Sequence, residues 1–198
     1  MYRPLIALLT LIISLSVSAD DGCFPDDVLP ENMFPVLEFV TNKGNIEVEL
    51  NRNRAPATVN NFLRYVLDGH YENTIFHRVI AEFVVQGGGY TPEFVEKPVR
   101  EPVLNESGNG LPNRSGSIAM ARYNDPHSAT SQFFFNMNNN ESLNPNPRSW
   151  GYTVFGDVIG GFEVLEQIAA VETGYSAGLD APDVPLEPIV LQEVRVKE

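Results

Sequence analysis

Apolar and polar positions follow two different periods along this chain. Between residues 36 and 50, apolar residues alternate with polar ones on both sides of an Asn-Lys-Gly-Asn turn, which predicts a β-hairpin with one buried face. Between residues 55 and 69, apolar residues recur at helical spacing after Pro56, which predicts a helix because proline suits the first helical turn. A second helix with one apolar face is predicted from about residue 162 to residue 170.

Most of the remaining apolar residues come in short runs between Gly, Pro and Asn clusters, a pattern that is typical of strands. Many short strands and only two helices favour a closed β-barrel or a β-sandwich over a parallel α/β sheet. Neither an internal repeat nor a second domain is apparent, so one domain is predicted over residues 35–198. The strand-like runs lie at residues 75–76, 79–80, 83–85, 118–121, 133–135, 154–155 and 189–196, and long loops are expected at 90–114, 137–149 and 171–188.

The first 19 residues are typical of a secretory signal peptide. Arg3 precedes an apolar run, and small residues end it at Ala19. The uncharged stretch is shorter than the roughly 20 residues that a membrane-spanning helix needs, although an uncleaved membrane anchor is the alternative. We therefore expect export to the periplasm, with secretion as the alternative, and no stable membrane insertion after the signal is removed.

Residues 20–34 are acidic, contain two prolines and show no periodicity, so a flexible acidic lead-in is expected before the domain. Cys23, the only cysteine, cannot form an internal disulfide. It is read as a free thiol, or as an intermolecular partner.

Composition excludes several classes of protein. The 198 residues carry a formal net charge of −13, which argues against nucleic-acid binding because phosphates require clustered Lys and Arg. A hydrophobic content of 43% argues against a disordered chain. No phosphate-binding loop, nucleophile elbow or metal-spaced set of Cys and His occurs in the sequence, and no metal site is predicted.

Candidate chemistry is concentrated in the run from Phe76 to Gly88. Strict alternation in a strand would place Phe76, Arg78 and Ile80 on one face. An arginine among apolar neighbours is unfavourable unless it is paired or takes part in function, so Arg78 is a candidate functional residue.

Three blocks of this sequence resemble the cyclophilin-type peptidyl-prolyl cis-trans isomerases, in the family's order and spacing. The first is Phe76-His-Arg with Phe83 and Gln86-Gly-Gly. The second is Gly116–Arg122 with Ser128–Asn136, and the third is Gly151–Asp157. The resemblance covers about residues 36–197, and Asn105-Glu106 with Met120-Ala121-Arg122 resembles the bacterial, periplasmic-like branch.

The resemblance implies an eight-stranded antiparallel closed β-barrel capped by two α-helices, with the site on an outer face because side chains fill so small a barrel. It implies isomerisation of X-Pro bonds, with Arg78 as the catalytic residue and no metal or other cofactor. It also implies that the protein binds proline-containing polypeptides as a monomer and assists the folding of exported proteins. The substrate-binding positions that it implies are His77, Phe83, Gln86, Met120, Ala121, Arg122, Gln132, Phe134, Leu143 and Tyr152.

Two alternative functions and two departures from the family pattern accompany this interpretation. A chaperone or adaptor with the same fold would bind proline segments with little turnover, and a hydrolase using His77 with Asp125 or Ser131 has no supporting motif. Ser142 stands where many relatives carry a tryptophan that contacts cyclosporin, so weak cyclosporin binding is expected. Tyr152 stands where the family often has histidine.

Overall fold

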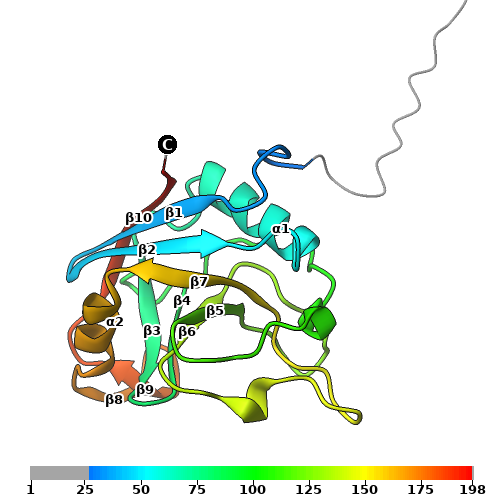
Figure 1. The fold of residues 1–198 in the computed structure, drawn as a ribbon. Coiled ribbons are helices and arrows are strands. Elements are labelled where there is room, and N and C mark those ends of the chain that lie inside the picture. Colours follow the sequence, from blue (N-terminus) through cyan, green and yellow to red (C-terminus); the bar gives the residue numbers. More distant parts are fainter. Residues whose placement is uncertain (1–26, 198) are drawn as a thin grey trace, which may run out of the picture.

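The computed structural model describes residues 27–197, which form a closed barrel of eight β-strands with two α-helices and a small separate sheet (Figure 1). The predicted signal peptide, Cys23 and the beginning of the predicted lead-in lie outside the described residues. Among the residues described, no helix is both long and apolar enough to span a membrane.

The barrel strands follow the order β1-β10-β3-β4-β6-β5-β7-β2, and β2 pairs with β1 to close it. Each neighbouring pair is antiparallel. Closure leaves the barrel without a free edge. The eight-stranded antiparallel barrel is therefore confirmed. Its strands are β1 (Val36–Thr41), β2 (Gly44–Leu50), β3 (Thr74–Ile80), β4 (Val84–Gly87), β5 (Ser117–Met120), β6 (Phe133–Asn136), β7 (Val154–Gly160) and β10 (Val190–Val196).

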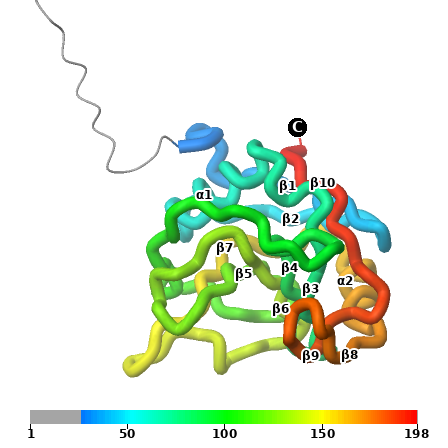
Figure 2. The backbone as a smooth tube through the Cα atoms, turned by 180° about the vertical axis from the view of Figure 1, so that it is seen from behind, coloured from blue at the N-terminus to red at the C-terminus, as the bar shows by residue number. Residues whose placement is uncertain are grey.

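Two helices lie on opposite sides of the barrel, as both views show (Figures 1 and 2). Helix α1 (Pro56–Leu67) begins at the proline and buries Val59, Phe62 and Leu63. Helix α2 (Phe162–Ala169) buries Val164, Leu165 and Ile168. Two short 3₁₀ helices, η1 (Ser107–Asn109) and η2 (Glu141–Leu143), lie within the expected long loops.

The segment 171–188 differs from its prediction as a loop. It contains a two-stranded antiparallel sheet of β8 (Thr173–Ser176) and β9 (Ala181–Pro185). These strands are short and mostly not buried, and β9 contains two prolines. Such a segment lacks the apolar alternation by which a strand is recognised in sequence.

Aromatic rings fill the barrel interior. The Phe133 ring lies 5.5 Å from that of Phe39 and 5.6 Å from that of Phe62, measured between centroids. Phe135 also faces this interior, whereas Phe134 between them belongs to a separate cluster outside it. Because successive side chains of a strand point to opposite faces, filling the interior with Phe133 and Phe135 turns Phe134 outward.

The described end of the predicted lead-in is tied to the domain. The Val28 N–H donates to Asn60 Oδ1 at 2.6 Å. Arg52, which is 5% exposed, donates from Nε to the Asn32 carbonyl at 3.1 Å and from Nη2 to the Val28 carbonyl. Residues 28–32 thus contact helix α1 and the loop before it.

Candidate active site

The candidate site lies on the outer face of β4, β6, β5 and β7. Val84, Ala119, Phe134 and Val154 each point outward there and form a buried apolar cluster that is distinct from the barrel core. The partly buried residues packed on this outer cluster are Phe83, Leu111, Ala121, Leu143 and Tyr152.

Arg78 reaches this face because of an irregularity in β3. Opposite β4, Phe76 pairs with Gly87 and Arg78 pairs with Gln86, so His77 is an extra residue between them. Phe76 and Val79 both face the barrel interior. The prediction that Phe76 and Arg78 share one face is therefore wrong. It assumed strict alternation, and a β-bulge shifts the side-chain register here.

The Arg78 side chain lies between the apolar cluster and a row of amides. Its Nη1 donates to Gln86 Oε1 at 3.4 Å, and its Cζ lies 5.9 Å from the centroid of the Phe83 ring. Among the described residues Arg78 has no carboxylate within ion-pair distance. Its charge is therefore held beside an apolar surface with most of its donors available.

Gln86 and Gln132 continue the polar row. The Gln86 Nε2 donates to Gln132 Oε1 at 3.1 Å. Arg78 can only donate, so it fixes the orientation of the Gln86 amide, and this in turn fixes that of Gln132. Tyr90, for which the sequence offers no signal, lies beside Gln132 at the end of this row.

Arg122 and Tyr152 form the far edge of the site. Tyr152 packs edge-on against Phe134, with ring centroids 5.6 Å apart. The Cζ of Arg122 lies 4.6 Å from the centroid of the Tyr152 ring, within cation–π range. Ala121 packs against the cluster, and its N–H donates to the Gln132 carbonyl at 2.9 Å.

Two proposed binding residues lie elsewhere. Met120 is 1% exposed and belongs to the interior core, because Ala119 before it takes the outward position of β5. His77 is 8% exposed, and its ring lies 4.8 Å from that of Tyr90. Burial lowers the pKa of His77 to about 4. Neither side chain lies in the outer cluster.

Leu111 is a member of the site that sequence reasoning missed. It packs against the outer cluster from the loop that follows η1. That loop has no apolar periodicity, so no pattern distinguishes Leu111 from other loop residues. Only its position in space identifies it.

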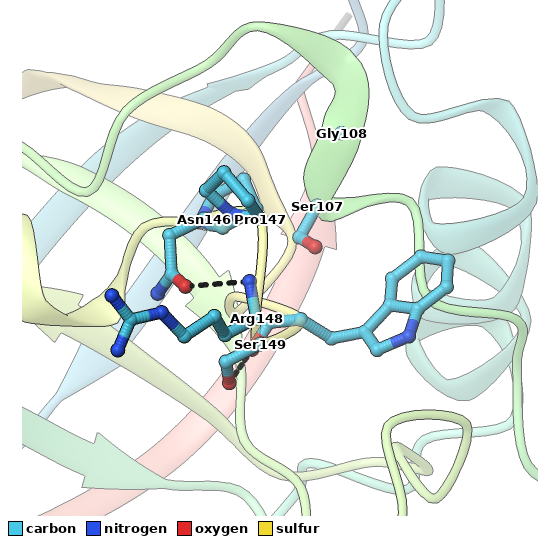
Figure 3. A pocket seen from close by; sticks show the side chains of 8 residues that line it. Ser107, Gly108, Asn146, Pro147, Arg148 and Ser149 are labelled. Carbon is cyan, nitrogen blue, oxygen red and sulfur yellow. Dashed lines mark hydrogen bonds between the residues drawn. The ribbon is translucent and has the colours of Figure 1, made fainter.

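Two cavities lie away from the predicted site residues. One of about 380 Å³ lies where η1 faces the hairpin of residues 146–149 (Figure 3). Another of about 520 Å³ lies beside helix α1. Neither is lined by a predicted site residue. In the described part of the chain, no three His, Cys, Asp or Glu residues come together as a metal site.

Comparisons with known proteins show the family to which this chain belongs. Residues 36–196 match the family model described as cyclophilin type peptidyl-prolyl cis-trans isomerase/CLD. The chain is 49% identical to peptidyl-prolyl cis-trans isomerase cyp18 of Streptomyces antibioticus, over 81% of this chain and 97% of that protein. It is 46% identical to peptidyl-prolyl cis-trans isomerase B of Escherichia coli, over 82% of this chain and all of that protein.

A solved structure shows the same fold. The cyclophilin type peptidyl-prolyl cis-trans isomerase of Cryptosporidium parvum superposes with a TM-score of 0.66 at 26% identity, covering 83% of this chain and 98% of that one. A second structure of that protein, determined in the presence of the dipeptide Ala-Pro, gives a TM-score of 0.65, covering 82% of this chain and 99% of that one. The chain belongs to the cyclophilin family and is a peptidyl-prolyl cis-trans isomerase.

Proposed function

We propose that this isomerase assists the folding of exported proteins by rotating X-Pro bonds, with Arg78 as its catalytic residue. The observation that carries the catalytic assignment is the position of the Arg78 guanidinium. It is hydrogen-bonded to Gln86 and has no carboxylate partner among the described residues, and it lies beside an apolar cluster on the outer side of the barrel.

Rotation about a prolyl bond requires the loss of amide resonance, over a barrier of ~18–20 kcal/mol. In the twisted transition state the prolyl nitrogen becomes pyramidal and regains a lone pair. A guanidinium that donates to this nitrogen stabilises the twisted state and does little for the planar one, which is the requirement for catalysis. Arginine suits the role because it stays protonated and presents a rigid set of donors.

The proline ring would occupy the outer apolar cluster, against Phe134, Phe83 and Leu143. Gln86 donates one amide N–H to Gln132, which leaves its second N–H for a carbonyl of the bound peptide. With the proline side anchored, the other side of the bond can rotate. No metal, nucleotide or covalent intermediate is needed for this reaction.

The decisive experiment measures cis-trans isomerisation of a proline peptide by wild type and by Arg78→Ala. We expect Arg78→Ala to lose most activity while its unfolding midpoint stays near that of wild type. Arg114→Ala is the matched control, because Arg114 is an exposed arginine paired with Asp157 at 3.0 Å. Near-normal turnover by Arg78→Ala would refute the assignment. Peptide binding without turnover by wild type would instead favour a proline-segment chaperone.

Export is supported by the signal-like first 19 residues. We propose a periplasmic monomer whose clients are exported proteins. To test export, the full chain is expressed, the cells are fractionated and the mass of the protein is measured. An uncleaved protein retained in the membrane would contradict the proposal. Ser142 in place of a tryptophan supports weak cyclosporin binding, which inhibition at nanomolar drug would contradict.

A further inference from the structure

The side chain of Arg122 donates to backbone carbonyls of its own chain. Arg122 lies two residues beyond the end of β5. Its Nη2 donates to the Trp150 carbonyl at 2.8 Å, and its Nε donates to the Gly151 carbonyl at 3.2 Å. Its Nη1 donates to the neighbouring Tyr123 carbonyl at 2.8 Å. All three nitrogens of the guanidinium are thus engaged by backbone oxygens.

The face of the guanidinium is engaged as well, because its Cζ lies 4.6 Å from the centroid of the Tyr152 ring. Among the described residues Arg122 forms no ion pair. One arginine therefore contacts residues 150, 151 and 152 in succession. A lysine could not do this, because a single ammonium lacks the planar fork of donors.

The segment that Arg122 holds carries one wall of the proposed proline pocket. The Tyr152 N–H donates to the Leu143 carbonyl at 2.9 Å, and the Tyr152 ring packs on Phe134. Gly151 is so close to the preceding loop that an added Cβ would lie 2.4 Å from the Pro145 nitrogen. Residues 150–152 and residues 143–145 therefore have little freedom to move separately.

We propose that Arg122 is a positioning residue whose side chain fastens the loop of residues 143–152 to the end of β5, and so preforms the wall of the proline pocket made by Leu143 and Tyr152. This inference rests on the proposed site. The Arg122 backbone remains a candidate peptide contact, but the Arg122 guanidinium is assigned to the loop and not to the substrate. A preformed wall lowers the ordering cost of binding, so its loss weakens peptide binding.

The test compares Arg122→Lys with wild type, with Arg148→Lys as the matched control. Arg148 is an exposed arginine within the same loop, and its backbone N–H donates to Asn146 Oδ1 (Figure 3). We expect Arg122→Lys to raise KM for a neutral proline peptide about three- to tenfold with kcat within about twofold, because the pocket and not Arg78 is disturbed. Arg148→Lys should leave both constants unchanged.

Hydrogen exchange of the Tyr152 amide gives a readout of the wall itself. Its exchange should be at least about tenfold faster in Arg122→Lys than in wild type, because the bond to Leu143 loses its support. Unchanged KM together with unchanged exchange would overturn the proposal. A KM effect confined to peptides with an acidic residue would also overturn it, since the guanidinium would then bind substrate charge.

A measurement on wild type keeps the proposal testable should Arg122→Lys fail to fold. The Arg122 Nε–H resonance should be protected from exchange in the free protein and should barely shift when proline peptide saturates the site. A large shift would contradict the proposal. Arg78→Ala is assayed in parallel. Near-normal turnover by Arg78→Ala would contradict the proposed catalytic role of Arg78. Loss of turnover in Arg78→Ala together with wild-type behaviour of Arg122→Lys would contradict only the positioning role of Arg122.

Discussion

Acidification is expected to destabilise the protein through His77. The imidazole is 8% exposed and packs against Tyr90. Burial, with a smaller contribution from the Arg78 charge, lowers its pKa from 6.5 to about 4. The unfolded chain therefore binds a proton near pH 6.5, whereas the native protein resists protonation until about pH 4. As the pH falls through this window, the unfolded state binds more protons and the free energy of unfolding decreases.

The size of the effect follows from these two pKa values. Linkage gives a loss of about 2 kcal/mol at pH 5 relative to pH 8, and a loss of about 3 kcal/mol at pH 4. The contribution of neutral His77 to stability is fully present above pH 6.5. A loss of this size is a substantial part of the stability of an ordinary domain.

Urea unfolding at pH 8, 6 and 5 checks this prediction in wild type and in His77→Asn. Other groups titrate equally in both proteins, so the difference between the two pH dependences isolates His77. We expect wild type to lose about 2 kcal/mol more than the variant between pH 8 and pH 5. The His77 ring resonance in wild type should also remain that of a neutral imidazole at pH 5. Equal pH dependence in the two proteins would refute the reasoning, whatever their absolute stabilities.

Three further substitutions test the site and the core. Gln86→Leu removes the amide that bonds both Arg78 and Gln132, so kcat/KM for a proline peptide should fall about tenfold. An unchanged kcat/KM would contradict the role of the amide row. Phe133→Ala removes a ring from the centre of a fully buried aromatic core and should lower the unfolding free energy by about 3–5 kcal/mol in urea titration. A loss below about 1 kcal/mol would show that the core collapses around the smaller side chain. Gly161→Ala places a side chain at φ +74, where its Cβ would lie 2.1 Å from the Asn45 carbonyl oxygen. The unfolding free energy should therefore fall by more than about 1 kcal/mol. An unfolding midpoint equal to that of wild type would contradict the strain.

Local pattern was sufficient for most elements of the fold. The alternation across the Asn-Lys-Gly-Asn turn predicted β1 and β2, and the proline with its helical spacing predicted α1. Predicted and observed bounds of α2 differ by about one residue. These elements were predictable because each has a single buried face, which imposes a period on the sequence. The sheet of β8 and β9 was missed because its strands bury little and carry no such period.

The choice between a barrel and a sandwich was not decided by periodicity. Both architectures use the same alternating strands, and they differ only in which strands pair. Here β10 pairs with both β1 and β3, although the segments are far apart in the chain. Long-range pairing of this kind leaves no trace in the composition of a single strand, so the choice came from the family resemblance and then from the structure.

The sequence by itself determined the two residues to which the proposed chemistry is assigned, Arg78 and Gln86. One arginine in an apolar run, followed by Gln86 in a block with a family signature, was visible without coordinates. Tertiary structure alone decided on which side of the barrel wall these side chains lie. The bulge at His77 separates Arg78 from the interior, and alternation in β5 sends Met120 inward while Ala119 faces the site.

The role of Arg122 likewise depended on tertiary structure, because its partners lie near residue 150 on another segment. A sequence records side-chain types and their spacing along the chain. The direction of each side chain is decided by strand register, bulges and contacts between distant segments, because these determine which face the backbone presents.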